Sequence, residues 1–253
     1  MDADYGAQYR DLFTRHWWWR ARETVILDAL ARHQRPGGWG NVLDVGCGDG
    51  LFFDTLRTLP GVALVEGVEP AAALVASDGP HRRHIHVAPF DASFDVQRRY
   101  GLILMLDVLE HLPDPVASLR HAVTLLEPDG IYLATVPAFM ALWTRHDDLN
   151  HHVTRYDRPS LARAASDAGL EIVEMRYFFR WTAAAKLVTR FLEWVRPAEP
   201  AAPRTPAPAV NSLLRALSRL EERLLGPLGV PFGSSLLVVG RRARREKGEA
   251  IDP

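Results

Sequence analysis

The chain has 253 residues, of which 47% are hydrophobic and 24% charged, and its formal net charge is −1. This length is enough for one sizeable core, with or without an appendage, and the small net charge excludes a global field that would favour nucleic acid or an anionic membrane. The single cysteine excludes an internal disulfide and fits a reducing compartment. The N-terminal residues are acidic and aromatic, unlike a signal peptide, and no apolar run approaches about 20 residues. These features predict a cytoplasmic protein.

The first predicted element is a long helix from about Leu12 to Arg32, within an N-terminal helical cap over residues 1–40. Five of its residues share one face at helical spacing: Trp18, Arg22, Val25, Ile26 and Ala29. Three consecutive tryptophans, 17–19, either cover the sheet and the cofactor cleft or help to wall a substrate pocket, since aromatic side chains combine a large apolar area with a polar handle.

A glycine-rich turn follows the first predicted strand, 41–45. The glycines lie at alternate positions, 46, 48 and 50, and a helix is expected over 51–59. Glycine lets the backbone take positive φ and lets a ligand approach closely, while a helix start offers free N–H groups. In the dinucleotide fingerprint G-x-G-x-x-G the third glycine would fall at Leu51, which argues against a nicotinamide-dependent oxidoreductase.

An acid followed by G-x-G-x-G resembles the first motif of the class I S-adenosylmethionine (SAM)-dependent methyltransferases. The resemblance implies that SAM is bound here, with Asp44 near its ammonium group and the turn residues Gly46, Cys47 and Gly48 beside it. Glu69 ends the second predicted strand, 63–68, where an acid accepts hydrogen bonds from both ribose hydroxyls. In the family an acid at this position has that role.

The third and fourth predicted strands each lead to a candidate cofactor contact. Strand three is expected over 84–90, and the resemblance places Asp91 after it against the adenine amino group, with Asp95 as a competitor. Strand four, 101–106, is continuously apolar, as a central parallel strand should be. Its last residue, Leu106, is expected to give the cofactor a backbone or apolar contact.

The string after strand four, residues 107–115, reads D-V-L-E-H-L-P-D-P, and many family members carry nearly the same one. Asp107, Glu110 and His111 share one face if the turn is helical. The ubiquinone-pathway O-methyltransferases resemble this stretch and use an acid-x-x-Glu-His set to hold a divalent metal. The alternative, which we adopt, is that these side chains close the turn at the cofactor rim, so we assign no metal ligand.

A polar, aromatic loop, 138–156, follows the predicted strand five, 131–136. It resembles a family segment that reads H-D-x-x-x-H-x-x-R-Y. Substrates meet such sheets beyond the carboxyl ends of the strands. His152 is the candidate catalytic general base, because the pKa of an unperturbed imidazole is close to neutral; the alternative is that it orders the loop.

More than fifty residues separate the predicted strand six, 171–179, from strand seven, 234–240. The sequence between them predicts an amphipathic helix over 181–196, a Pro/Ala-rich linker over 197–209 and a second amphipathic helix over 211–225. These helices form either a lid packed on the core or a surface over 181–225 that contacts a membrane or a partner protein.

Together these elements predict an α/β fold with a Rossmann-like, doubly wound seven-stranded sheet in the order 3-2-1-4-5-7-6, strand seven antiparallel. We expect a SAM-binding core over 41–180, a helical insertion over 181–233, and the last strand with a basic tail over 234–253.

The resemblance implies methyl transfer from SAM to an oxygen, nitrogen or carbon atom of a small molecule, aromatic or lipid-like. A SAM-binding scaffold without turnover is the main alternative. No basic stripe or base-flipping motif favours a nucleic-acid partner, and no oligomeric state is predicted.

Overall fold

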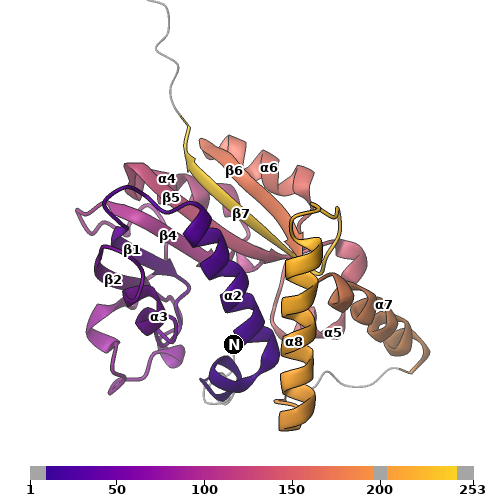
Figure 1. Ribbon diagram of the computed structural model, residues 1–253. Coiled ribbons are helices and arrows are strands. Elements are labelled where there is room, and N and C mark those ends of the chain that lie inside the picture. The colour runs from indigo at the N-terminus through magenta and orange to yellow at the C-terminus, as the bar shows by residue number, and fades with distance from the viewer. Residues whose placement is uncertain (1–9, 197–203, 244–253) are drawn as a thin grey trace, which may run out of the picture.

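The computed structural model describes residues 10–196 and 204–243, and in this part of the chain a seven-stranded sheet forms the centre (Figure 1). The strand order is β3-β2-β1-β4-β5-β7-β6. The strands are β1 Gly40–Val45, β2 Val62–Val68, β3 Ile85–His86, β4 Tyr100–Leu106, β5 Leu126–Pro137, β6 Leu170–Phe178 and β7 Ser235–Arg242. β7 is antiparallel to β5 and β6, and the other pairs are parallel. The predicted order and the antiparallel seventh strand are confirmed.

Helices cover both faces of the sheet because its central strands are apolar on both sides. Along β4, Ile103 and Met105 pack into one core with α4 Pro115–Leu125 and α6 Arg158–Asp167. The alternate residues Leu102 and Leu104 pack into the other core with α2 Trp17–Arg32 and α3 Phe53–Arg57. Successive side chains of a strand point to opposite faces of the sheet, so an apolar strand contributes to both cores.

Three predicted elements differ from the observed ones. The N-terminal helix is interrupted at His16, whose Nδ1 accepts a hydrogen bond from the Trp18 N–H at 3.2 Å, so residues 10–15 and α2 are separate helical segments. The predicted helix 51–59 is helical only over α3. The predicted strand 84–90 pairs only at Ile85 and His86, and Pro89 lacks the N–H that a longer ladder would need.

The insertion contains two helices, α7 Arg180–Val195 and α8 Pro208–Leu225, close to the predicted spans. α7 begins after Phe179, which gives no side-chain cap to the helix. Glu221 of α8 supplies the cap instead, because its two carboxylate oxygens accept hydrogen bonds from the backbone N–H groups of Arg180 and Trp181, each at 2.7 Å. Residues 197–203 of the predicted linker and 244–253 of the predicted basic tail lie outside the described residues.

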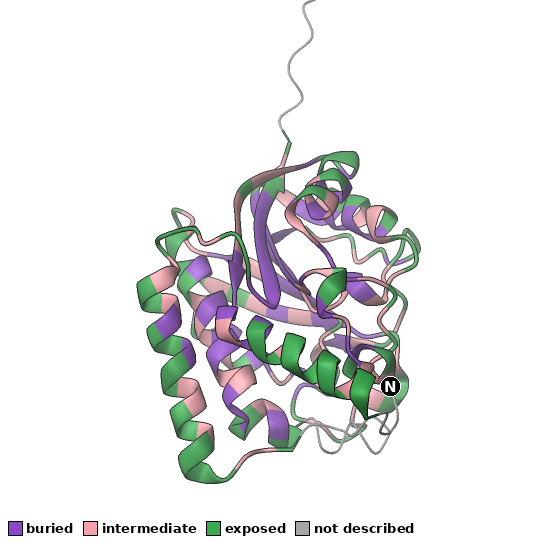
Figure 2. Cartoon of the chain, turned by 90° about the vertical axis from the view of Figure 1, so that its right-hand side faces the viewer, coloured by how far each residue is buried: buried purple, intermediate pink, exposed green. Residues whose placement is uncertain are grey.

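α8 is oriented with its polar side toward the rest of the molecule. Asn211 accepts a hydrogen bond from the Trp17 N–H and donates one to the Arg15 carbonyl, each at 2.8 Å. Ser218 accepts one from the Trp181 indole N–H at 3.1 Å. A leucine stripe therefore faces outward, with exposed fractions of 42–67%; it consists of Leu213, Leu217, Leu220 and Leu224. Figure 2 shows that the outward sides of α7 and α8 are largely exposed.

Candidate active site

A cavity of about 840 Å³ lies where the chain leaves the carboxyl ends of β1, β2, β4 and β5. The residues at these ends, Val45, Glu69, Leu106 and Pro137, all line it. The strand order reverses here, because β1 has β2 on one side and β4 on the other. Open α/β sheets bind their ligands at such a switch point.

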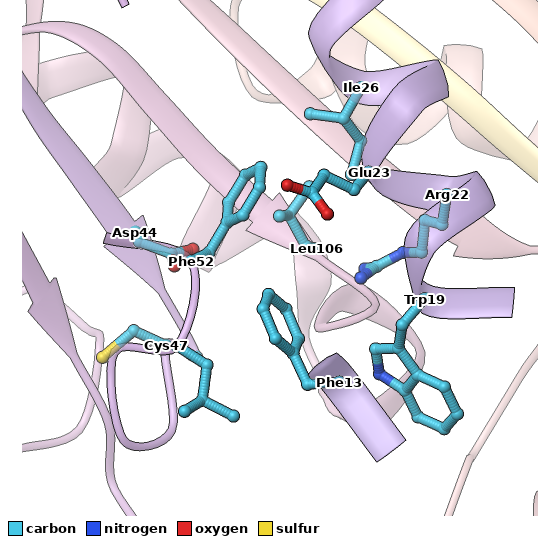
Figure 3. Close-up of a pocket in the computed structure, with 11 residues that line it drawn as sticks. Phe13, Trp19, Arg22, Glu23, Ile26, Asp44, Cys47, Phe52 and Leu106 are labelled. Atoms are coloured by element: carbon cyan, nitrogen blue, oxygen red, sulfur yellow. The ribbon is translucent and has the colours of Figure 1, made fainter. Parts of the chain in front are cut away.

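A smaller pocket of about 40 Å³ adjoins this cavity and shares part of its lining. Five residues line both: Trp19, Gly46, Cys47, Leu51 and Leu106. In Figure 3, Phe13, Trp19 and Arg22 from the N-terminal helical segments lie opposite Asp44 and Cys47. The N-terminal segments therefore form one wall of the pocket, and the glycine-rich turn after β1 forms the opposite wall.

The glycine turn is fixed on one side and open on the other. Gly46 has φ 72°, and a Cβ built there would lie 2.6 Å from Cγ2 of Val108. The Gly46 N–H donates to the Val68 carbonyl at 2.8 Å, which ties the turn to β2. Gly48 has φ 53° with no atom within 4 Å of a built Cβ. A ligand therefore has room beside Gly48, whereas Gly46 is required by packing.

Asp44 is a buried carboxyl near the end of β1, and it lines the smaller pocket. Burial raises its pKa from its ordinary value near 3.8 to about 7, the nearby Arg22 guanidinium lowers it, and Glu69 raises it further. A cationic ligand group beside Asp44 would favour the ionised form. The residue thus has the position and chemistry to meet an ammonium group.

Glu69 joins the ends of β1 and β2 and lines the large cavity. Its Oε2 accepts a hydrogen bond from the Gly48 N–H at 3.0 Å, and its Oε1 accepts one from the Ala71 N–H at 2.9 Å. Burial raises the pKa of this carboxyl, and the two backbone N–H groups oppose that shift. Each oxygen keeps a further lone pair with which to accept a hydroxyl proton.

Cys47 and Leu106 both line the cavity, as the sequence predicts for cofactor contacts. Burial raises the pKa of the Cys47 thiol, with Asp44 and Glu69 adding to the effect. The thiol is therefore neutral, and Cys47 has no thiolate with which to act as a nucleophile.

Asp91 is not brought to the cavity with the other predicted cofactor residues. It is exposed, does not line the cavity, and accepts a hydrogen bond from the Ser93 N–H at 2.8 Å. The Ser93 hydroxyl and N–H lower the pKa of this carboxyl. The difference arises because β3 ends at His86, so Asp91 follows a loop rather than a strand end. Phe90, its neighbour, is the residue that lines the cavity.

The three side chains of the predicted Asp107-Glu110-His111 face are separated. Asp107 has φ 57°, and its carboxylate pairs with Arg22 Nη2 at 2.8 Å and accepts from the Thr135 hydroxyl at 3.0 Å. Glu110 is fully buried in the 3₁₀ turn Leu109–His111, and its oxygens have no hydrogen-bond partner among the described residues. Burial, with a smaller effect of Asp107, raises the pKa of Glu110 well above its usual range.

Glu110 and His111 instead meet His152, and one ligand atom of each lies within 4.8 Å of the others. Among the described residues this is the group that could hold a metal ion, and Asp107 is not part of it. The acid-x-x-Glu-His set implied by the resemblance is therefore not assembled. Its place is taken by one carboxyl group and two imidazoles.

His152 lines the cavity and is held from behind by Asp147. Its Nδ1 lies 2.8 Å from Oδ1 of Asp147, a buried carboxylate. Asp147 also accepts from the Arg155 guanidinium at 2.8 and 3.0 Å, and these partners, together with the Thr144 N–H, hold its pKa below the usual range. Because the Asp147 carboxylate only accepts, Nδ1 of His152 is the donor in this bond, and in the neutral imidazole Nε2 is the nitrogen that can take up a proton.

Sequence reasoning missed Asp147 as a functional residue. It lies in the loop expected to meet the substrate, but so do Asp148 and several histidines, and the sequence does not distinguish them. A local signal does exist: Thr144 and Asp147 form a capping box at the start of α5 Arg145–Leu149. That spacing indicates that Asp147 turns back toward the chain rather than outward.

The tryptophans 17–19 also line the cavity. Trp17 packs against Trp181 and Phe179, with ring centroids 5.1 and 6.1 Å apart. The Arg22 guanidinium lies over the Trp18 ring at 5.4 Å. The three tryptophans therefore pack on the core and also form an aromatic wall of the cavity. Their position combines the two predicted ones, a cover over the sheet and a wall of a pocket.

The chain is similar to methyltransferases in sequence and in fold. The model of the family described as methyltransferase domain matches residues 14–175. A ubiquinone biosynthesis O-methyltransferase of Xanthomonas axonopodis pv. citri is 27% identical over 195 residues, which cover 67% of this chain and 79% of that protein.

Two solved structures have a similar fold. One is a chain of the complex that contains the Haloferax volcanii Trm112 methyltransferase activator, with a TM-score of 0.59, 21% identity, and 96% of each chain covered. The other is the N-methyltransferase NodS of Bradyrhizobium japonicum in complex with S-adenosyl-L-homocysteine (SAH). Its TM-score is 0.55 at 15% identity, with 92% of this chain and 91% of that chain covered.

Proposed function

This chain belongs to the methyltransferase-domain family, and we propose that, as a SAM-dependent methyltransferase, it methylates a hydroxyl group of an aromatic small molecule. The observation that carries the proposal is the His152–Asp147 pair on the wall of the cavity. A phenolic hydroxyl, with a pKa near 10, must lose its proton as its oxygen is methylated. An imidazole held in place by a carboxylate is suited to take up that proton.

The residues proposed to hold the methyl donor lie at the ends of β1, β2 and β4. SAM supplies a methyl group already activated on a sulfonium centre. Asp44 would face its ammonium group, Glu69 its ribose hydroxyls, and Gly48 would leave room for close approach. Cys47 and Leu106 would give apolar contacts. Asp91 is not included, because it lies outside the lining of the cavity.

On the acceptor side, the chain's own residues orient the hydroxyl group and take its proton. Nε2 of His152 accepts the proton, and the Asp147 carboxylate stabilises the resulting imidazolium, as a buried carboxylate does for other catalytic histidines. General-base catalysis of this kind contributes about 10²–10⁴-fold, and alignment for in-line attack can contribute about 7–11 kcal/mol. The tryptophans 17–19 would cover the aromatic ring of the acceptor.

We propose that no metal takes part. The base must keep Nε2 of His152 unligated, and burial raises the pKa of Glu110 well above its usual range, which disfavours the carboxylate form that a metal would bind. The relative named ubiquinone biosynthesis O-methyltransferase supports an oxygen atom as the methyl acceptor.

The outward leucine stripe of α8 favours peripheral contact with a lipid surface. The hydrogen bonds of Asn211, Ser218 and Glu221 fix the polar side of α8 inward, so the stripe cannot turn toward the core. Exposed Arg219 and Arg223 flank it and would meet anionic headgroups. None of the helices within residues 10–196 and 204–243 qualifies as a membrane-spanning segment. The proposed location is the cytoplasmic side, where the one thiol stays reduced.

Turnover with a phenolic acceptor pool and methyl-labelled SAM tests the proposed function. We expect label in an alkali-stable methyl ether, with SAH formed in equal amount. SAH binding without turnover on any phenol, catechol or hydroquinone would favour the scaffold alternative. Label in an amine or a carbon-methylated product would refute the hydroxyl acceptor.

A further inference from the structure

We propose that Lys186 binds a carboxylate group on the methyl acceptor and so selects an anionic aromatic substrate. The inference rests on the proposed function and specifies the substrate class. Lys186 lies in α7, which the family match over residues 14–175 does not include.

One face of α7 is fixed over the loop that carries the candidate base. Arg190 donates to the Met140 and Ala141 carbonyls at 3.2 and 2.8 Å, and Glu193 accepts from the Arg145 N–H at 3.2 Å. Positions 186, 190 and 193 follow helical spacing, so Lys186 lies one turn before Arg190 on the same face. The sequence of α7 therefore directs Lys186 toward the acceptor end of the cavity, which it lines with His146, Asn150 and His152.

Lys186 is a half-buried cation without a partner in the described part of the chain. Among those residues, no carboxylate lies within 4.0 Å of its ammonium group and no hydrogen bond joins it. Lysine is rarely buried unless it is paired. The neighbouring Arg155 differs, because its guanidinium is bonded to Asp147 and to the Ala138 carbonyl at 3.0 Å.

Neither of the two carboxylates that act on Lys186 is paired with it. Asp147 is bonded to Arg155, and Glu193 accepts a hydrogen bond from the Arg145 N–H. Burial and the Lys186 cation lower the pKa of His146 to about 4, so that imidazole is neutral at pH 7. Burial and the positive charge of Arg155 lower the pKa of Lys186 to about 8, while Asp147 and Glu193 act in the opposite direction. A bound carboxylate would give the Lys186 ammonium group a direct partner.

At the donor end, Glu69 lines the cavity on the turn after β2, and its carboxylate is bonded to two backbone N–H groups rather than to a cationic side chain. Asp49 and Asp107 also line the cavity there, but they are paired with Arg10 and Arg22. A ligand with a cationic donor at one end and an anionic acceptor at the other would match both. An acceptor without charge would leave Lys186 desolvated and unpaired, which disfavours its binding.

Binding of two matched ring compounds tests the proposal. The probes are 3,4-dihydroxybenzoate and 3,4-dihydroxybenzamide, which differ in charge but hardly in shape. Calorimetry is performed on full-length protein saturated with SAH, for wild type, Lys186→Met and Lys186→Arg. We expect wild type to bind the benzoate at least tenfold more tightly than the benzamide, equivalent to about 1.4 kcal/mol. Lys186→Met should remove the preference, and Lys186→Arg should retain part of it.

The outcomes separate this inference from the proposed function. SAH affinity and melting temperature control for folding, and both should be the same in the three proteins. Wild-type protein that takes up SAH but does not prefer the benzoate, including protein that binds neither ring compound, overturns the role of Lys186. A preference that survives in Lys186→Met does the same. Failure to take up SAH at all refutes the proposed function instead.

Discussion

Nδ1 of His152 lies 2.8 Å from Oδ1 of Asp147, and the carboxylate of Asp147 is fully buried. A buried carboxylate in this position fixes both the orientation and the tautomer of the imidazole. The pair therefore converts one histidine of a histidine-rich loop into a defined proton acceptor facing the cavity. The other histidines of the loop lack this partner among the described residues.

His152→Gln should lower kcat by about 10²–10⁴-fold, because glutamine cannot accept the acceptor's proton. SAH affinity should stay within twofold, since His152 lies on the acceptor side. His84→Gln is the matched control, because His84 lies outside the cavity lining. Full turnover by His152→Gln on a phenolic acceptor would remove the base from the mechanism. Asp147→Asn should also lower kcat, with the loss smaller for acceptors of lower pKa.

Asp44→Asn should stabilise the ligand-free protein at pH 8 while weakening SAM binding. The folded-state pKa of Asp44 is raised to about 7, so between pH 4 and 7 the folded state binds more protons than the unfolded state. Stability then falls as pH rises through this window, and the ionised group is destabilising above it. We expect a gain of about 1 kcal/mol or more at pH 8 that vanishes below pH 4. Denaturant unfolding at both pH values measures it; an unchanged difference between them would contradict the assignment.

Glu69→Gln should weaken SAH binding at least tenfold, whereas Asp91→Asn should change it by less than twofold. Glu69 lines the cavity and accepts hydrogen bonds at the ends of two strands, but Asp91 lies outside the lining. Calorimetric titration with SAH measures both variants. A large loss in Asp91→Asn alone would show that the loop after β3 closes over the adenine when SAH binds.

Turnover should be insensitive to chelation. We expect activity to be unchanged after treatment with EDTA and unchanged again on addition of Mg²⁺ or Zn²⁺, because the proposed base needs Nε2 of His152 free of metal and burial of Glu110 disfavours its carboxylate form. A loss on chelation that Mg²⁺ or Zn²⁺ restores would instead assign Glu110, His111 and His152 to a metal. Glu110→Gln separates the two cases, since it would remove a metal ligand but keep a buried side chain of the same size.

Replacement of Leu217 and Leu220 by Glu should remove binding to vesicles that contain anionic lipid. Both side chains belong to the outward stripe of α8, where charge prevents insertion of the apolar face. Val87→Glu is the control, because Val87 is a similarly exposed apolar residue beside β3. Co-sedimentation with phosphatidylglycerol-containing vesicles measures the effect. Equal binding by the two mutant proteins would assign the stripe to another partner.

The sequence predicted the sheet because each central strand carries its own signal. Strands such as β4 are continuously apolar, and the turn after β1 has glycines at fixed spacing. The strand order came from the family resemblance rather than from the residues alone. Short elements were less predictable: β3 has two paired residues, and its length depends on contacts with β2 that no local pattern encodes.

The site was predicted best where a role depends on position at a strand end. Glu69 and Leu106 occupy such positions and line the cavity. Asp91 failed to reach it because its strand ends earlier than expected. Asp147 and Lys186 could not be assigned from the sequence, since their environment depends on α5, α7 and the loop after β5 meeting in space.

The cap that Glu221 gives to α7 has a practical consequence. Because Glu221 of α8 supplies the missing acceptors for the first turn of α7, the start of α7 is bonded to α8 independently of the chain between Arg196 and Arg204. Lengthening that connection costs little closure entropy. It is therefore a site at which a fluorescent reporter or an affinity handle could be introduced into the protein while both helices keep their mutual register.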